Sequence, residues 1–179
     1  MECKQTGFTL IELLVGLAVL GIVVALATPT LASALQRTTS AITHRALVDS
    51  IMTARVDAIT QGHPVTVCPS SDGMHCREDP VWDYGWLVYE DPGHSAQPAN
   101  ARAILARTEG PSRDLTIRST AGRQQVRYQP SGMASGSNFS LYVCSRRDSH
   151  LLGSVIVSSA GRVRTEHSAN ASETCPYQP

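Results

Sequence analysis

The apolar residues of this chain are concentrated in one stretch near its start. From Phe8 to Ala27 the only ionisable side chain is Glu12, and most of the others are apolar. Twenty helical residues at a rise of about 1.5 Å span about 30 Å, the thickness of the hydrocarbon core of a membrane. The pattern therefore predicts a membrane-spanning helix over residues 8–28.

An amphipathic pattern continues the helix over residues 29–62. Pro29 removes one backbone hydrogen bond and is expected to interrupt the helix, and a Gly and a Pro after Gln61 are expected to end it near residue 60. His44 and Arg55 lie near the apolar face, so each should snorkel or bind a partner. The face expected to pack on the rest of the chain, at about 100° per residue, comprises Ala41, Val48, Met52, Val56 and Ile59, with Ile51 at its edge.

Residues 63–179 have no helical period and are expected to form a β-rich head. Short runs rich in β-branched and aromatic residues alternate there with Pro, Gly, Ser and Asn clusters. A helix packed on antiparallel strands gives an α+β fold. The predicted strands are Val65–Cys68, Gly85–Glu90, Arg102–Arg107, Leu115–Arg118, Gln124–Gln129, Phe139–Cys144 and Ser154–Ser158.

One carboxylate interrupts the apolar stretch close to its start. A charge at the centre of a membrane helix costs roughly 2.5–3.5 kcal/mol, so Glu12, although nearer the end, favours a partner. A short polar segment ending in Gly7 precedes the stretch and Phe8 begins it, whereas a secretory signal would place its cleavage site after the apolar run. The segment from Gly7 to Glu12 resembles the start of type IV prepilins and pseudopilins.

This resemblance implies a processing and assembly pathway. Residues 1–7 would be a leader that prepilin peptidase removes after Gly7, leaving a methylated amine on Phe8. Glu12 would pair with the amine of a neighbouring subunit. The expected partners are other major and minor pilins and prepilin peptidase. The chain would cross the inner membrane once, with its head on the periplasmic side, before entering a pilus.

Four cysteines lie in the predicted head, and a fifth, Cys3, lies in the expected leader. An even number beyond a membrane anchor fits disulfides in an oxidising compartment. Three connectivities are possible, and proximity in sequence favours pairing the first with the second and the third with the fourth. A zinc site that includes His75 is disfavoured because the spacing matches no Cys-x-x-Cys knuckle. The four cysteines are Cys68, Cys76, Cys144 and Cys175.

Three segments of the head together resemble the GspH/FimT family of minor pilins and minor pseudopilins. The first is the loop from Cys68 to Cys76, the second is Trp82-x-x-Gly85-Trp86-Leu87-Val88-Tyr89, and the third is Ser159–Arg164. The resemblance implies a type IV pilin-like fold. Both tryptophans are expected to be core or helix-packing residues.

Charge is unevenly distributed although the formal net charge is zero. Residues 1–100 contain five basic and ten acidic residues, a balance of −5, and residues 101–179 contain ten arginines and five acidic residues, a balance of +5. An arginine-rich distal half is a candidate anion-binding surface, and the alternative is a solvated strand surface with scattered charges. The sequence contains no phosphate loop, nucleophile elbow or zinc-protease motif, so we expect neither an enzyme nor a cofactor.

The motif Gly161-Arg162-Val163-Arg164 is the candidate binding site. Alternate strand residues share a face about 6.6–7 Å apart, so two guanidiniums could engage phosphates along one nucleic-acid backbone while Val163 points into the sheet. In the FimT branch of the family, a Gly-Arg-x-Arg motif is associated with DNA binding in natural transformation. Double-stranded DNA is therefore the expected partner of Gly161, Arg162 and Arg164.

The extent and the purpose of this site remain open at the level of sequence. Glu166 lies close enough to neutralise Arg164, so the motif could have a purely structural role. The chain could then prime pilus assembly without binding DNA, or be a minor pseudopilin of a type II secretion system. Arg146 and Arg147 are expected to enlarge the basic patch, and further candidates are Arg123, Arg127 and His167.

Overall fold

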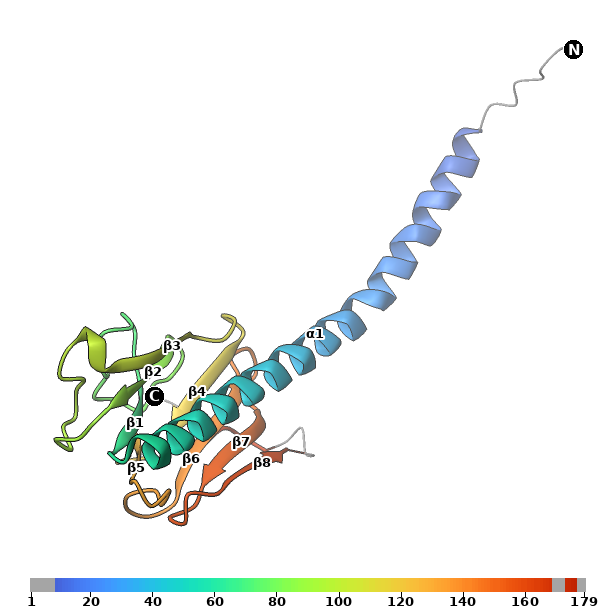
Figure 1. Ribbon diagram of the computed structural model, residues 1–179. Coiled ribbons are helices and arrows are strands. Elements are labelled where there is room, and N and C mark those ends of the chain that lie inside the picture. Colours follow the sequence, from blue (N-terminus) through green and yellow to red (C-terminus); the bar gives the residue numbers. More distant parts are fainter. Residues whose placement is uncertain (1–8, 169–172, 177–179) are drawn as a thin grey trace, which may run out of the picture. The chain divides into compact units, whose positions relative to one another are not determined.

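The computed structural model of the protein describes residues 9–168 and 173–176 and comprises one long helix followed by short strands (Figure 1). The chain divides into two compact units, residues 1–38 and 39–179, and we call the second the head unit. Helix α1, Leu10–Gln61, belongs to both units. The predicted processing positions Gly7 and Phe8 lie outside the described residues.

The first part of α1 is an apolar helix with its side chains uncovered. Leu10, Ile11 and Leu26 expose 77%, 65% and 71% of their surface, and α1 is long and apolar enough to cross a membrane by length and composition. The predicted single long helix is confirmed, because α1 is continuous through Pro29. One missing N–H does not end a helix whose neighbouring residues keep their own hydrogen bonds.

The second part of α1 packs on the strands with a face that only partly overlaps the predicted one, because Ile51 is buried and Val48 is partly buried against the core. Met52, Val56 and Ile59, predicted to be covered, are 41%, 52% and 49% exposed, so that prediction is wrong. The face that packs consists of Leu47, Ile51, Ala54 and Ala58, all fully buried, and it continues through Ser40, Thr43 and His44. Because several residues on this face are small or polar, a search for apolar residues at helical spacing did not identify the whole face.

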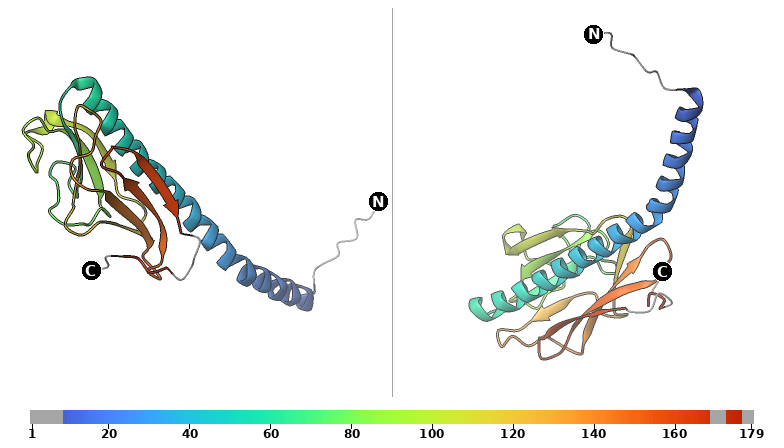
Figure 2. Two further views of the ribbon diagram at one scale, coloured as in Figure 1. Left: turned by 90° about the horizontal axis from the view of Figure 1, so that it is seen from below. Right: turned by 90° about the vertical axis from the view of Figure 1, so that its right-hand side faces the viewer.

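Two four-stranded antiparallel sheets complete the head unit. The first sheet has the order β3-β2-β1-β5, and its strands are β1 Val65–Pro69, β2 Gly85–Glu90, β3 Ile104–Glu109 and β5 Val126–Tyr128. The second sheet has the order β4-β6-β7-β8, and its strands are β4 Leu115–Ser119, β6 Phe139–Ser145, β7 Leu151–Val157 and β8 Val163–His167. The head-unit part of α1 lies across both sheets (Figure 2). The predicted α+β fold is confirmed.

Of the predicted strands, only β2 has the predicted bounds, and β8 was not among those predicted. Two of the differences have a clear structural cause. β3 begins two residues later than the predicted Arg102–Arg107, because Asn100 caps a short 3-10 helix, Ala101–Ala103, by accepting two backbone hydrogen bonds. β7 begins three residues before the predicted Ser154–Ser158, because the glycine in this segment sits within the strand and does not end it.

The core lies between α1 and the two sheets. Trp82 and Trp86 are 0% and 2% exposed, which confirms their expected burial. The ring of Trp82 packs 5.9 Å from that of Phe139, at the start of β6. Trp86 Nε1 donates a hydrogen bond of 2.9 Å to Ser50 Oγ, so the first sheet is tied to α1 by a polar contact as well as by packing.

Both disulfides favoured by sequence proximity are present. Cys68–Cys76 closes the loop after β1 across a sequence separation of 8, and Cys144–Cys175 joins β6 to the chain after β8 across a separation of 31. All four half-cystines are buried. The second bridge therefore fixes the distal segment to the edge of the core.

Replacing each disulfide by two alanines should destabilise the head by different amounts. Chain-entropy estimates give about 3.7 kcal/mol for Cys144→Ala/Cys175→Ala and about 2.5 kcal/mol for Cys68→Ala/Cys76→Ala, because the longer loop restricts the unfolded chain more. Denaturant unfolding monitored by tryptophan fluorescence measures both. Equal losses, or the reverse order, would contradict this account.

A buried histidine lies where the polar end of the α1 face meets the second sheet. His44 is 3% exposed, its Nδ1 hydrogen-bonds the Ser40 carbonyl at 2.8 Å, and its ring centroid lies 5.5 Å from that of His167 on β8. Burial, together with the charge of His167, lowers the pKa of His44 below its usual value of 6.5. The folded head thus favours the neutral imidazole.

We expect the head to lose stability on mild acidification. Because the pKa of His44 is lower in the folded than in the unfolded state, its contribution is intact above about pH 6.5 and declines as pH falls through the folded-state pKa. The difference between the urea midpoints at about pH 7.5 and about pH 5 should be smaller in His44→Gln than in the unmodified chain. His94→Asn, at an exposed histidine with φ 53°, serves as the control and should leave the pH dependence unchanged.

Candidate functional site

The Gly-Arg-x-Arg motif forms the turn between β7 and β8. The N–H of Gly161 donates to the Ser158 carbonyl at 2.8 Å, and the N–H of Ser158 donates to the Arg162 carbonyl at 2.9 Å. Gly161 has φ +77°, and a Cβ built there would lie 2.0 Å from the carbonyl oxygen of Gly132. The turn therefore requires glycine for its backbone angle and for its close contact with the loop that follows β5.

Arg55 of α1 fixes this turn from beneath. Its Nε donates to the Gly132 carbonyl at 2.9 Å and its Nη2 to the Ala160 carbonyl at 3.5 Å. Arg55 Nε also lies 3.1 Å from the position of a Gly161 Cβ. The partner that the sequence suggested for Arg55 is thus a pair of backbone carbonyls, and Arg55 is a positioning residue for the motif.

Arg162 and Arg164 point away from the core, as their alternation predicts. Val163 pairs with Val157 and packs partly buried against the core, and both arginines are exposed. They border a cavity of about 270 Å³ whose other lining residues include Asn138 and Ser158. The cavity thus offers guanidinium, hydroxyl and amide groups, all of which can donate hydrogen bonds to an anion.

The two arginines differ in their partners. Arg164 Nε lies 3.2 Å from Glu166 Oε1, with side chains 68% and 57% exposed. An exposed pair of this kind contributes at most about 1 kcal/mol, so a ligand could compete for Arg164. Within the described residues, no carboxylate lies within ion-pair distance of Arg162.

Arg146 and Arg147 do not join the motif. Arg146 Nη2 donates to Asp83 Oδ2 at 2.9 Å and its Nε to the Arg113 carbonyl at 2.8 Å, so it secures the far end of the second sheet. Arg147 is exposed in the turn after β6. Because β6 separates this end from the β7–β8 turn by six residue steps, the two ends are about 20 Å apart. The prediction of one patch containing both arginines is wrong.

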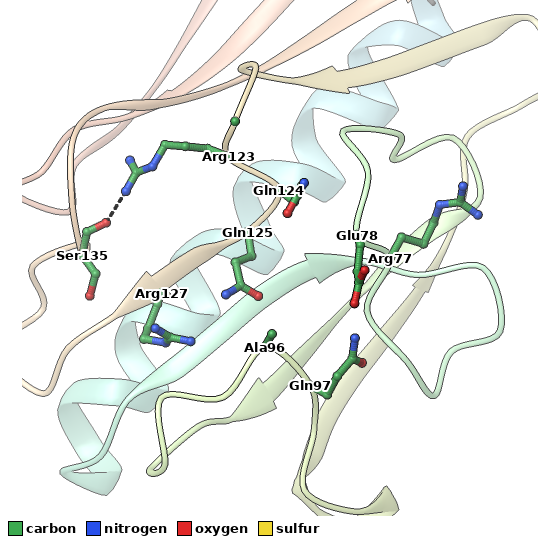
Figure 3. Close-up of a pocket in the computed structure, with 10 residues that line it drawn as sticks. Arg77, Glu78, Ala96, Gln97, Arg123, Gln124, Gln125, Arg127 and Ser135 are labelled. Atoms are coloured by element: carbon green, nitrogen blue, oxygen red, sulfur yellow. Dashed lines mark hydrogen bonds between the residues drawn. The ribbon is translucent and has the colours of Figure 1, made fainter.

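The further candidates have three different environments. Arg127 pairs with the buried carboxylate of Asp91, Nε to Oδ2 at 2.5 Å, and is thereby neutralised. His167 lies beside His44 at the end of β8 away from the motif. Arg123 lines a second cavity, of about 280 Å³, and its guanidinium points toward Ser135 (Figure 3). The side chain of Arg123 donates to two carbonyls of the loop, residues 129–138, that reaches the β7–β8 turn.

At the other end of α1, Glu12 lies in the first helical turn. Its backbone N–H donates to Thr9 Oγ1 at 3.3 Å, so Thr9 caps the helix. The sequence Thr-x-x-Glu is the pattern of a capping box. Sequence reasoning recognised the charge of Glu12 but missed this cap, for which the spacing from Thr9 was the available signal.

Comparison with known proteins places this architecture in a family. Residues 43–161 match the family described as type II transport protein GspH, and residues 3–28 match the prokaryotic N-terminal methylation motif. The first match covers about two thirds of the 179 residues. The chain belongs to the GspH family. No curated protein matches it by sequence.

Two solved structures have the same fold as this GspH-family chain. The minor pilin FimU of Pseudomonas aeruginosa aligns with a TM-score of 0.60 and 19% identity over 79% of this chain and 98% of FimU. The minor pseudopilin EpsH of Vibrio cholerae aligns with a TM-score of 0.51 and 12% identity over 72% of this chain and 97% of EpsH. At such identities the likeness establishes the fold alone.

The family match confirms the coarser predictions. This GspH-family chain is a structural, non-enzymatic subunit of the pilin and pseudopilin kind. Its N-terminal methylation motif implies processing by prepilin peptidase, membrane anchoring and assembly with other pilins. The roles of Glu12, Arg162 and Arg164 stay predictions.

Substituting Gly161 should test how tightly the motif is held. Gly161→Ala combines a positive φ with a Cβ 2.0 Å from a carbonyl oxygen, whereas Gly122→Ala has the same φ strain, +75°, in open space. We expect a loss of about 1–2 kcal/mol for Gly122→Ala and about 3 kcal/mol or more for Gly161→Ala. Thermal unfolding compares the two variants. A Gly161 variant as stable as the Gly122 variant would show that the turn can rearrange at little cost in stability.

Proposed function

We propose that this chain is a minor type IV pilin that binds the DNA backbone through Arg162 and Arg164 during DNA uptake in natural transformation. The observation that carries this proposal is the presence of two exposed guanidiniums on one strand face beside a cavity with further hydrogen-bond donors. Arginine binds phosphate with bidentate geometry, and residues two apart on a strand are about 6.6–7 Å apart. One backbone can therefore engage both.

The proposal includes the route by which the site reaches the cell surface. Residues 1–7 are removed after Gly7, and the new amine on Phe8 pairs with Glu12 of a neighbouring subunit. Residues 8–28 cross the inner membrane once before assembly. The head, residues 63–179, is then on the periplasmic side, and the pilus carries it outward with Arg162 and Arg164 accessible, near the tip.

The binding proposed is independent of base sequence. The arginines lie in and just before the exposed strand β8, and contacts of guanidiniums with phosphates position a duplex without reading its bases. Phosphate contacts release counterions, so affinity should fall steeply with salt. The site would hold any duplex that reaches it.

A second function is favoured by one contact and by the family. The Arg164–Glu166 pair shows that this strand already accommodates a carboxylate, and the family description refers to type II transport. In this alternative, Arg162 and Arg164 bridge to acidic residues of an adjacent subunit. The chain would then prime pilus assembly or act as a minor pseudopilin.

A pair of matched double variants tests the DNA site. Arg162→Gln/Arg164→Gln removes two charges from the β7–β8 turn, and Arg113→Gln/Arg147→Gln removes two from exposed positions at the opposite end of the second sheet. Duplex binding is measured by mobility shift at about 50 and 200 mM salt, and the first variant should reduce the salt slope by about two, since each phosphate contact contributes about one. The second should bind like the unmodified protein.

Cellular readouts separate the two functions. Loss of transformation with normal piliation in the Arg162→Gln/Arg164→Gln strain supports DNA binding. Loss of piliation or secretion supports the assembly role. Unchanged duplex binding by this variant would overturn the site.

A further inference from the structure

We propose that Arg123 is a third phosphate contact, which extends the Arg162–Arg164 site across Asn138 so that it fits a continuous backbone and not an isolated phosphate. This inference rests on the proposed function. It concerns how far the site reaches over the head. The experiment below distinguishes failure of the extension from failure of the function itself.

Strand register brings Arg123 to the same end of the second sheet as the motif. Phe139, at the start of β6, pairs with Val157, which in turn pairs with Val163, so β6 and β8 begin at the same end of the sheet, on either side of β7. β4, at the opposite edge of the sheet from β8, ends at this same end, and the N–H of Thr120 after it donates to the Ser140 carbonyl at 2.9 Å. Arg123 follows three residues later in the turn that this bond starts.

Arg123 lines the second cavity, and one of its carbonyl partners is next in sequence to a residue that lines the Arg162 cavity. Its guanidinium donates to the carbonyls of Ser135, at 2.6 Å, and Ser137. Ser137 is followed at once by Asn138, which lines the cavity together with Arg162. One residue step, about 3.8 Å between Cα atoms, therefore separates the carbonyl that holds Arg123 from the side chain that borders the motif.

A glycine permits this placement. A Cβ built on Gly136 would lie 2.0 Å from Arg123 Nη2 and 3.0 Å from its Cζ. Gly136 also has φ +85°, so the loop both turns there and leaves space for the guanidinium. The position of Arg123 is thus fixed by the loop that enters β6, and it does not depend on a flexible side chain finding its place.

The partners of Arg123 leave its charge uncompensated. Both are neutral carbonyls, and no carboxylate forms an ion pair with Arg123 in the part of the chain that the structure describes. Other arginines of the head are paired, Arg77 with Asp79 and Arg127 with Asp91. A guanidinium has five N–H donors, so the two carbonyls leave donors for a phosphate.

Three cations at one end of the second sheet define the ligand that they fit. Arg164 lies in β8 and Arg162 in the turn just before it, and Arg123 lies beyond Asn138. A single phosphate could meet only part of this row, whereas a DNA backbone carries a charge at every nucleotide. The row fits an extended polyanion that runs from β8 toward the β4–β5 connection.

The test compares four forms of the full chain in a nonionic detergent: unmodified, Arg123→Gln, Arg123→Lys and Arg147→Gln. A labelled duplex of about 15 base pairs is titrated by fluorescence anisotropy at several salt concentrations. Arg123→Gln should lower the salt slope by about one and weaken binding about three- to tenfold near 0.1 M salt. Arg123→Lys retains the charge and should retain the slope, and Arg147→Gln should match the unmodified chain.

Each other result has a definite meaning. If Arg123→Gln binds normally while Arg162→Gln/Arg164→Gln does not, the extension is overturned and the proposed function stands. If neither variant changes binding, both are overturned. If Arg123→Lys and Arg123→Gln lose binding equally and both melt at a lower temperature, Arg123 only holds the loop, and the extension is again overturned.

Discussion

Burial of one face of α1 holds the head together, because the two sheets share no strand and meet on this helix. Leu47 and Ile51 are completely buried between them, and each such side chain contributes about 1.5–3 kcal/mol by leaving water. Ala54 and Ala58 on the same face are small enough for close approach. The same helix also holds the β7–β8 turn and the loop after β5, since Arg55 donates to the carbonyls of Ala160 and Gly132.

Features with a local signal could be predicted from the sequence. The length of the apolar stretch predicted α1, burial of Trp82 followed from its size and setting, and proximity favoured the Cys68–Cys76 bridge. The covered face of α1 could not be predicted, because its polar residues, such as His44, are accommodated by partners on distant strands. Hydrophobic periodicity identifies only apolar residues, whereas the buried face of α1 also contains polar residues.

The arginines illustrate the same limit at the site. The alternation around Val163 predicted that Arg162 and Arg164 share an exposed face, because the two-residue period of a strand is local. Arg146 belongs to the same arginine-rich half of the chain, but its role is set by its hydrogen bond to Asp83, 63 residues away in sequence. A buried carboxylate partner such as Asp83 makes an arginine part of the framework, whereas the exposed Glu166 leaves Arg164 open to competition by a ligand. Only the folded chain distinguishes the two.

The Cys144–Cys175 bridge implies an order for two steps in the maturation of this subunit, membrane anchoring and disulfide formation. Disulfides persist in oxidising compartments and are rare in the cytosol, whereas the apolar stretch of α1 is complete as soon as it is synthesised. The chain can therefore be retained at a membrane before its distal segment is covalently closed onto β6. A head kept in a reducing environment would lack both this bridge and the Cys68–Cys76 bridge.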